Sequence, residues 1–222
     1  MSGSGIRAVV FDFDGVLANT EDLHLAAFQD VFRGRGWSLD RDAYFSNYLG
    51  FDDRGLIRGF GADNGISFTK SEIDAILIDK ARRYEQRIAR GEVLFSTAQP
   101  AVTRLGAAFK LAIASGSLRG EILTILRLNQ LTQHFPVVVG ADDVVNSKPA
   151  PDPYIAAVER LGVEARAAVA IEDAPLGLLA ARTAGLRTIG ITTSYPAHAL
   201  TAADIVIDSL DEVTPDMIGT LR

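Results

Sequence analysis

The chain has 222 residues, a formal net charge of −6, 48% hydrophobic residues and no cysteine. The negative charge argues against a general nucleic-acid-binding protein, and the missing thiols exclude disulfides, zinc–thiolate centres and cysteine nucleophiles. No apolar run approaches the roughly 20 residues of a membrane-spanning helix, and the N-terminal residues do not form a signal-peptide pattern. We therefore expect a globular, cytoplasmic protein without membrane or nucleic-acid partners, with a monomer as the default state.

Short apolar runs recur along the chain at intervals long enough to hold a helix. The first is IRAVVF at 6–11, and the later ones lie at 110–114, 136–140, 167–171, 187–191 and 204–207. Helical patterns separate the later runs, at 118–128, 152–161 and 175–184. Asp152 is a candidate N-cap, and Gly185 is a candidate helix stop. Alternating strands and helices predict an α/β protein with a Rossmann-like, doubly wound parallel sheet.

A long helical block separates the first apolar run from the second. Segments 20–34 and 70–90 have strongly helical patterns, and shorter helical pieces lie near 40–48 and 53–60. A single crossover helix needs far fewer residues than this interval contains. We therefore expect an inserted α-helical cap subdomain at 17–92 and a core domain formed by 1–16 and 93–222. The alternative is a series of surface helices that belong to the same core.

Side chains with useful chemistry follow four of the predicted strands. They are Asp12 and Asp14, then Ser115, Gly116 and Ser117, then Lys148 after a short loop, and finally Glu172 and Asp173. Ligands of open α/β sheets bind beyond the carboxyl ends of the strands, so these groups are predicted to converge. Four acids at one sheet edge would repel one another unless a cation lay among them. Carboxylates without histidine or cysteine favour Mg²⁺.

Four motifs carry a resemblance to a known family. They read DFDGVLANT (12–20), IASGS (113–117), SKPAPDPY (147–154) and IEDAPLGLLAARTAG (171–185). In this order they resemble the haloacid dehalogenase superfamily, and the last two resemble its branch of β-phosphoglucomutases and sugar-phosphate phosphatases. The likeness spans essentially the whole chain and is most specific in the predicted core.

The resemblance implies a Mg²⁺-dependent phosphatase for a small phosphorylated metabolite such as a sugar phosphate. Asp12 would attack phosphorus and become an aspartyl-phosphate. Asp14 would protonate the leaving oxygen and then activate the hydrolytic water. Mg²⁺ would be held by Asp12, the Asp14 carbonyl and Asp173, with Glu172 in or next to the ion's coordination sphere.

The resemblance also implies a set of substrate-binding residues. Ser115 and Lys148 would bind and neutralise the transferring phosphoryl group, together with the Gly116–Ser117 turn. His24 and Lys80 fall where β-phosphoglucomutases have a histidine and a lysine in the cap, and Arg54 is a further candidate. A cap that closes over the site would exclude bulk water.

Several activities compete with this interpretation. Dehalogenases and phosphonoacetaldehyde hydrolases lack the second acid, so Asp14 favours phosphoryl transfer. A β-phosphoglucomutase would have an arginine near Asp53 and a Lys-Asn pair in place of Leu118 and Arg119, so we favour a phosphatase over a mutase. A receiver-like domain or a noncatalytic phosphate-binding protein is a weaker alternative. The first is much shorter and has no cap, and the second would not require the full set of motifs.

Overall fold

The computed structural model describes residues 5–48, 51, 53–89 and 93–221. The chain forms two compact units. Residues 1–19 and 93–222 form one, which we call the core unit, and residues 20–92 form the other, the helical unit. The helical unit lies within the cap predicted at 17–92, although the predicted boundary at residue 92 falls outside the described residues. Its action as a cap stays a prediction.

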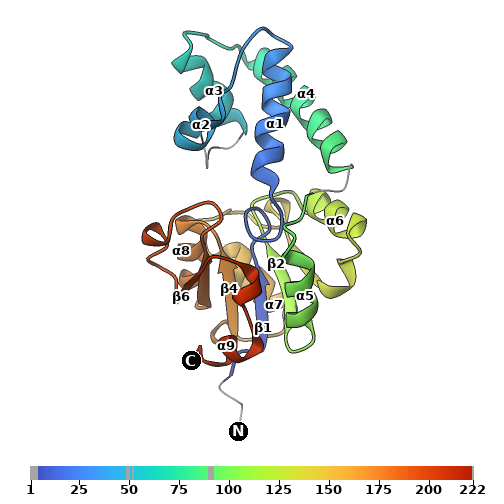
Figure 1. The fold of residues 1–222 in the computed structure, drawn as a ribbon, viewed down its shortest axis with the longest axis vertical. Coiled ribbons are helices and arrows are strands. Elements are labelled where there is room, and N and C mark those ends of the chain that lie inside the picture. The colour runs from blue at the N-terminus through green and yellow to red at the C-terminus, as the bar shows by residue number, and fades with distance from the viewer. Residues whose placement is uncertain (1–4, 49–50, 52, 90–92, 222) are drawn as a thin grey trace. The chain divides into compact units, whose positions relative to one another are not determined.

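A six-stranded parallel sheet forms the centre of the core unit, with strand order β3-β2-β1-β4-β5-β6. The strands are β1 (Ala8–Phe11), β2 (Lys110–Ala114), β3 (Val137–Val139), β4 (Ala168–Glu172), β5 (Arg187–Ile191) and β6 (Ile205–Ile207). Strand β1 lies inside the sheet between β2 and β4 (Figure 1), and all four of its residues are buried. Burial on both faces explains why this strand is a continuous apolar run rather than an alternating one.

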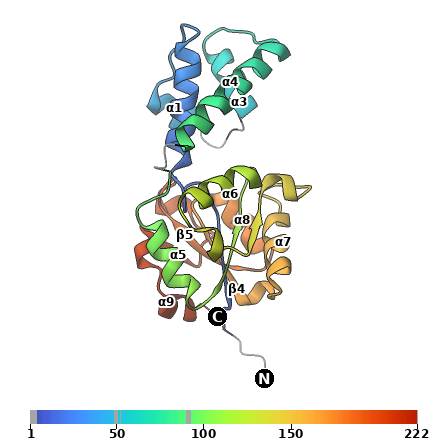
Figure 2. The same cartoon turned by 90° about the vertical axis from the view of Figure 1, so that its right-hand side faces the viewer.

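Helices cover both faces of this sheet. They are α5 (Ala98–Gly106), α6 (Arg119–Leu128), α7 (Asp152–Leu161), α8 (Pro175–Thr183) and α9 (Pro215–Gly219). Short 3₁₀ turns lie at Thr132–His134, Ala141–Asp143, Ala165–Ala167, Ala197–Ala199 and Leu210–Glu212. Helices α5 and α7 lie on opposite sides of the sheet (Figure 2). The predicted α/β, Rossmann-like, doubly wound architecture is therefore confirmed.

The two predicted signals at the helix ends differ in outcome. Gly185 has φ +87° directly after the end of α8, so this glycine stops the helix as predicted. The predicted N-cap at Asp152 is wrong, because Asp152 is already the first residue of α7 and Pro151 takes the N-cap position. The Asp152 carboxylate instead accepts a hydrogen bond from Asn146 Nδ2 at 2.9 Å.

The helical unit contains α1 (Thr20–Arg33), α2 (Arg41–Ala43), a π-helical turn (Tyr44–Tyr48), α3 (Asp53–Asp63) and α4 (Lys70–Ile88). Aromatic rings fill its centre, and the ring centroids of Phe32 and Phe60 lie 4.4 Å apart. Trp37 packs edge-on against Phe32 and Phe68, which confirms the interpretation of Trp37 as a packing residue. Among the described residues, no helix is long and apolar enough to cross a membrane.

Candidate active site

The register of the central strands brings the predicted site residues to one edge of the sheet. Phe11, the last residue of β1, pairs with Ile113 in β2 and with Ile171 in β4. The next residue along the chain, Asp12, donates its backbone N–H to the Ile171 carbonyl at 2.9 Å. The side chains that follow β1, β2 and β4 therefore leave the sheet at the same level, as parallel strands require.

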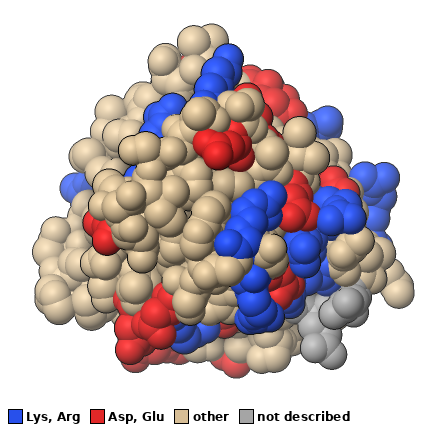
Figure 3. Space-filling model, turned by 90° about the horizontal axis from the view of Figure 1, so that it is seen from above, with Lys and Arg blue, Asp and Glu red and all other residues tan. Residues whose placement is uncertain are grey.

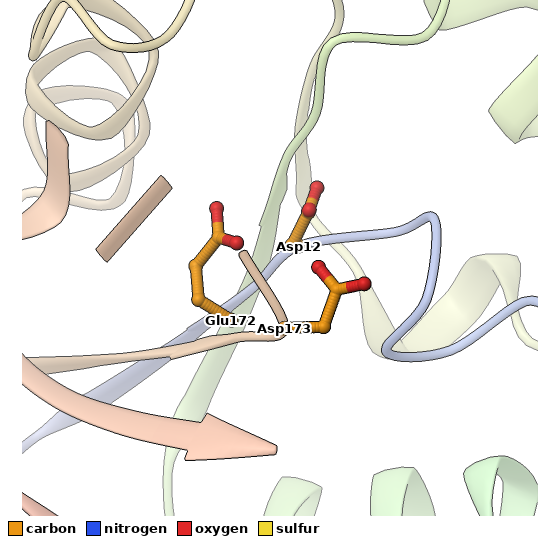
Figure 4. A group of neighbouring side chains, drawn as sticks. All are labelled: Asp12, Glu172 and Asp173. Atoms are coloured by element: carbon orange, nitrogen blue, oxygen red, sulfur yellow. The ribbon is translucent and has the colours of Figure 1, made fainter. Parts of the chain in front are cut away.

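Three carboxylates meet at this edge. Asp12, Glu172 and Asp173 are buried, and each offers one oxygen within 4.8 Å of the others. Figure 4 shows Glu172 and Asp173 on adjacent positions of one strand end, with Asp12 reaching the same space from the neighbouring strand. Burial and the Glu172 charge raise the pKa of Asp12 well above its usual range, and the same two causes raise the pKa of Asp173 to about 7. Such crowding is electrostatically unfavourable without a compensating cation.

Lys148 supplies one positive charge to this cluster. Its Nζ lies 2.9 Å from Asp12 Oδ1 and 2.6 Å from Glu172 Oε1, and its side chain is 13% exposed. Burial opposes the charged ammonium, but the Asp12 and Glu172 carboxylates outweigh it, so the pKa of Lys148 is raised. Lys148 therefore stays charged beside the Asp12 carboxylate, and it neutralises one of the three acids.

Helix α7 brings a tyrosine to the same cluster. The Tyr154 hydroxyl donates to Glu172 Oε1 at 2.6 Å, and Lys148 Nζ lies 5.1 Å from the centre of the Tyr154 ring. No role was predicted for Tyr154 from the sequence, although it is the last residue of the SKPAPDPY motif. Its position on the buried face of α7 indicates core packing, and only the structure shows where the hydroxyl points.

Asp14 lies beside the loop that follows β2. Ser117 Oγ donates to Asp14 Oδ2 at 2.6 Å, and Ser115 Oγ donates to the same oxygen at 3.1 Å. The Ser117 backbone N–H in turn donates to Ser115 Oγ at 2.9 Å. A Cβ at Gly116 would meet no atom within 4 Å, so the space around this turn does not require glycine. The two serines therefore fix one oxygen of Asp14.

The loop after β5 contributes two contacts that the sequence analysis missed. Ser194 Oγ donates to Asp173 Oδ2, and Thr193 Oγ1 donates to the carbonyl oxygen of Gly15. Gly15 has φ +75°, and a Cβ there would lie 1.8 Å from Asp173 Oδ2, so only glycine fits. The sequence signal was available, because 187–191 was predicted as a strand and hydroxyl residues directly follow it.

The predicted substrate-binding residues of the helical unit form two separate groups. Lys80 Nζ lies 2.6 Å from His24 Nδ1 and 2.8 Å from Asp53 Oδ2, and the Lys80 side chain is buried. The His24 ring packs on Tyr84 with centroids 4.3 Å apart. Arg54 makes an ion pair with Asp74 at 2.8 Å. The structure thus brings His24 and Lys80 together and places Arg54 in a different ion pair.

The residues at the sheet edge fit a small divalent cation. All of their donors are carboxylate oxygens, which are the hard ligands that Mg²⁺ prefers. Three buried acids beside one lysine leave negative charge that a cation would compensate, and burial together with this charge raises the pKa values of Asp12 and Asp173. Asp12 and Asp173 are candidate ligands, and Glu172 still has one oxygen, Oε2, that Lys148 and Tyr154 do not contact.

Comparisons with known proteins agree with this geometry. The family model for haloacid dehalogenase-like hydrolases matches residues 9–191. The chain is 32% identical to Protein CbbY of Rhodobacter capsulatus, covering 97% of this chain and 99% of that protein. It is 30% identical to validoxylamine A 7'-phosphate phosphatase of Streptomyces hygroscopicus subsp. limoneus, covering 96% and 98% of the two chains.

Solved structures extend the comparison to the fold. CbbY from Rhodobacter sphaeroides in complex with phosphate superposes with a TM-score of 0.80, at 31% identity over 93% of this chain and 96% of that one. A putative β-phosphoglucomutase from Thermotoga maritima gives a TM-score of 0.76 at 27% identity, covering 97% of both chains. The chain therefore belongs to the haloacid dehalogenase-like hydrolases and is a phosphatase of that family, a phosphoric monoester hydrolase.

Proposed function

We propose that this phosphatase depends on Mg²⁺ and hydrolyses a small phosphomonoester, a sugar phosphate or a similar metabolite, through an aspartyl-phosphate on Asp12. The observation that carries the proposal is the position of Asp12, which contacts Lys148 at 2.9 Å and lies in a buried group of carboxylates at the end of β1. A carboxylate can attack phosphorus once the charges of both anions have been reduced.

In the first proposed step, an oxygen of Asp12 forms a bond to phosphorus and the bond from phosphorus to the leaving oxygen breaks. Asp14 gives its proton to that leaving oxygen. In the second step, a water attacks phosphorus while Asp14 accepts the proton of the water, and the bond between phosphorus and Asp12 breaks. Phosphate and the free Asp12 carboxylate result, so atoms and charges balance over the cycle.

The contacts of Asp14 support its proposed role in proton transfer. Ser115 and Ser117 both donate to Oδ2, which fixes the orientation of the carboxyl group that would exchange the proton. Ser115 and the Ser117 backbone would also donate to a phosphoryl oxygen, and they would exchange partners when substrate binds. Lys148 would offset the growing charge on the transferring group.

Mg²⁺ would be held by Asp12, Asp173 and the Asp14 carbonyl, with Glu172 as a further candidate ligand. Its contribution would be to neutralise phosphoryl charge and orient the group for in-line attack. Ser194 Oγ donates to Asp173 Oδ2 and would so fix one of these ligands before the ion binds.

The helical unit supports a preference for substrates with one phosphate. Lys80 is the buried cation of this unit that corresponds to the cap lysine of the mutases, and Asp53 lies 2.8 Å from it. An acid at this distance neutralises the lysine and weakens it as a binding group for a second phosphate. We propose that His24 and Lys80 contact hydroxyl groups of the substrate and that Arg54 is a further contact.

A β-phosphoglucomutase is the second candidate. The close contact of His24 and Lys80 and the structural similarity to the putative β-phosphoglucomutase from Thermotoga maritima favour it. Its weakness is the carboxylate at Asp53, because a mutase must bind a second phosphate in two orientations. A cap function of the helical unit, a cytoplasmic location and a monomeric state stay predictions from the sequence.

A substrate panel tests the proposed function. Phosphorylated sugars, polyols and glycolate should release phosphate in the presence of Mg²⁺, with one class preferred, and a chelator should stop the release. With β-glucose 1-phosphate and its bisphosphate activator, free phosphate should form and glucose 6-phosphate should not. Accumulation of glucose 6-phosphate would identify a mutase instead.

Asp53→Asn should raise activity on bisphosphates relative to monophosphates.

A further inference from the structure

Tyr154 places a hydroxyl where packing alone would favour a phenylalanine. The side chain is fully buried in α7, and its neighbours in the core cluster include Ala112, Ala114 and Ala170 from the sheet. A buried hydroxyl costs free energy unless it makes a hydrogen bond, whereas a phenylalanine ring would fill the same space without that requirement. The hydroxyl must therefore be explained by its partner, Glu172.

Glu172 is confined on two sides. Its Oε1 accepts from the Tyr154 hydroxyl at 2.6 Å and from Lys148 Nζ at 2.6 Å. On the other side, a Cβ at Gly177 in α8 would lie 2.0 Å from Oε1, so the carboxylate presses directly on the helix backbone. The Ala174 backbone N–H approaches Oε2 at 3.4 Å. Helix α7 and helix α8 thus hold a fully buried carboxylate between them.

Lys148 depends on this carboxylate for its position. It comes from the loop before α7, and its ammonium sits between Glu172 Oε1 and Asp12 Oδ1. A lysine side chain has four rotatable bonds, and its ammonium has no preferred plane, so its position is set by the acceptors around it. If the carboxylate of Glu172 turned, the ammonium would follow it or lose one of its two partners.

We propose that Tyr154 is a positioning residue for phosphoryl transfer, which acts through Glu172 to fix the Lys148 ammonium at Asp12. The proposal rests on the proposed function, in which Lys148 neutralises the transferring group. Tyr154 touches neither substrate nor the reacting atoms. Its hydroxyl selects one orientation of Glu172, and that orientation directs the lysine at the nucleophile.

Tyr154→Phe isolates the hydroxyl, because the variant keeps the ring, its packing and its contact with Lys148. We expect kcat for p-nitrophenyl phosphate to fall about 10-fold while KM changes less than about 2-fold, since lysine placement matters most in the transition state. The matched control is Tyr48→Phe, which removes a buried tyrosine hydroxyl that bonds Asp63 Oδ2 at 2.5 Å in the helical unit. It should lower Tm by a similar amount and leave kcat unchanged. Equal kcat in Tyr154→Phe and wild type would overturn the proposal.

A double-mutant cycle tests whether Tyr154 acts through Glu172. Glu172→Gln should lower kcat by itself, and adding Tyr154→Phe to it should cause no further loss, because the intermediate group is already altered. A double variant in which the two losses multiply would show that Tyr154 acts by another route and would overturn the proposal.

A third measurement does not depend on activity. The rate at which acetic anhydride acylates Lys148, followed by mass spectrometry, should rise several-fold in Tyr154→Phe, while that of Lys80 stays constant as the internal reference. Equal Lys148 labelling in both proteins would overturn the positioning role. A wild-type protein without phosphatase activity would instead refute the proposed function, and the labelling result would still decide the role of Tyr154.

Discussion

Two carboxylate sites, one in each unit of this protein, have opposite surroundings. In the core unit, Asp12, Glu172 and Asp173 are buried within reach of one another, and Lys148 is the cation that contacts two of them. In the helical unit, a single carboxylate, that of Asp79, pairs with three arginines. Nitrogen atoms of Arg35, Arg82 and Arg83 lie 2.8 to 3.2 Å from its oxygens. Acidic and basic side chains also lie next to one another on the face shown in Figure 3.

This difference indicates that the carboxylate cluster of the core unit serves function at a cost in stability. Partly exposed acids paired with arginines cost little and contribute a small amount of stability. Buried acids crowded against other acids are unfavourable unless a cation or a reaction uses them. The pKa values of Asp12 and Asp173 are raised by burial and by Glu172, whereas the hydrogen bond from Arg82 helps to lower the pKa of Asp79. A carboxylate is therefore unfavourable where it is crowded against other acids, as at Asp12, and favourable where arginines surround it, as at Asp79.

The largest expected effect is the loss of the nucleophile. Asp12→Asn keeps the size of the side chain but removes the negative charge that would attack phosphorus in the proposed mechanism. Activity on p-nitrophenyl phosphate should fall at least about a thousandfold. The control is Asp216→Asn, which changes an exposed acid of the core unit in α9 and should leave activity unchanged. A variant with near wild-type turnover would remove Asp12 from the mechanism.

The second-largest effect is expected from metal removal, which should act on the carboxylate cluster of the core unit. A chelator should abolish activity, and added Mg²⁺ should raise the Tm of the wild type because the ion binds only the folded cluster. In Asp173→Asn, Mg²⁺ should no longer raise Tm. Because this change removes one of the repelling charges, the Tm of the variant in chelator should equal or exceed that of the wild type. A clear drop in that Tm would contradict the crowding described for the core unit.

A smaller effect is expected at Ser194. Its hydroxyl donates to Asp173 Oδ2 and so orients this carboxylate. Ser194→Ala should raise the Mg²⁺ concentration for half-maximal activity about 10-fold, with a smaller change in the rate at saturating Mg²⁺. If the Mg²⁺ requirement of the variant equals that of the wild type, Ser194 does not support the ion.

The smallest effect concerns the stability of the helical unit. The pKa of Asp79 is lowered on folding, so its contribution to the free energy of unfolding is present above the unfolded pKa of about 3.9 and disappears as pH falls through the lower folded value. Asp79→Asn should therefore destabilise the protein by up to about 1 kcal/mol at pH 7 and by less near pH 2. Chemical denaturation at both pH values measures this, and an equal difference at both would refute the charge argument.

Much of the core unit could be predicted from the sequence because local signals and global topology agree. Buried parallel strands produce continuous apolar runs, and the strand ends then identify Asp12, Ser115 and Asp173 as neighbours. Helix ends were less predictable. Asp152 has the residue type of an N-cap, but α7 begins one residue earlier than predicted. Pro151 is the N-cap, and the Asp152 carboxylate accepts a hydrogen bond from Asn146.

The remaining site residues could not be predicted, because their role depends on where one atom points. Tyr154 lies in a predicted helix and Ser194 lies three residues after a predicted strand. The strand marks hydroxyl residues such as Ser194 as candidates, but no pattern states that these two hydroxyls reach Glu172 and Asp173. In the helical unit, the ion pair of Lys80 with Asp53 spans two helices, so spacing along the chain does not reveal it. Under the proposed function, tertiary contacts of this kind would set the substrate preference.

Chemical trapping of the intermediate tests the central claim most directly. The enzyme is mixed with a good substrate, quenched within the first turnover and treated with borohydride, which reduces an aspartyl-phosphate to homoserine. Peptide mass spectrometry should then find homoserine at position 12 and unchanged aspartate at Asp14 and Asp173. A burst of phosphate with unmodified Asp12, or reduction at another carboxylate, would contradict the account.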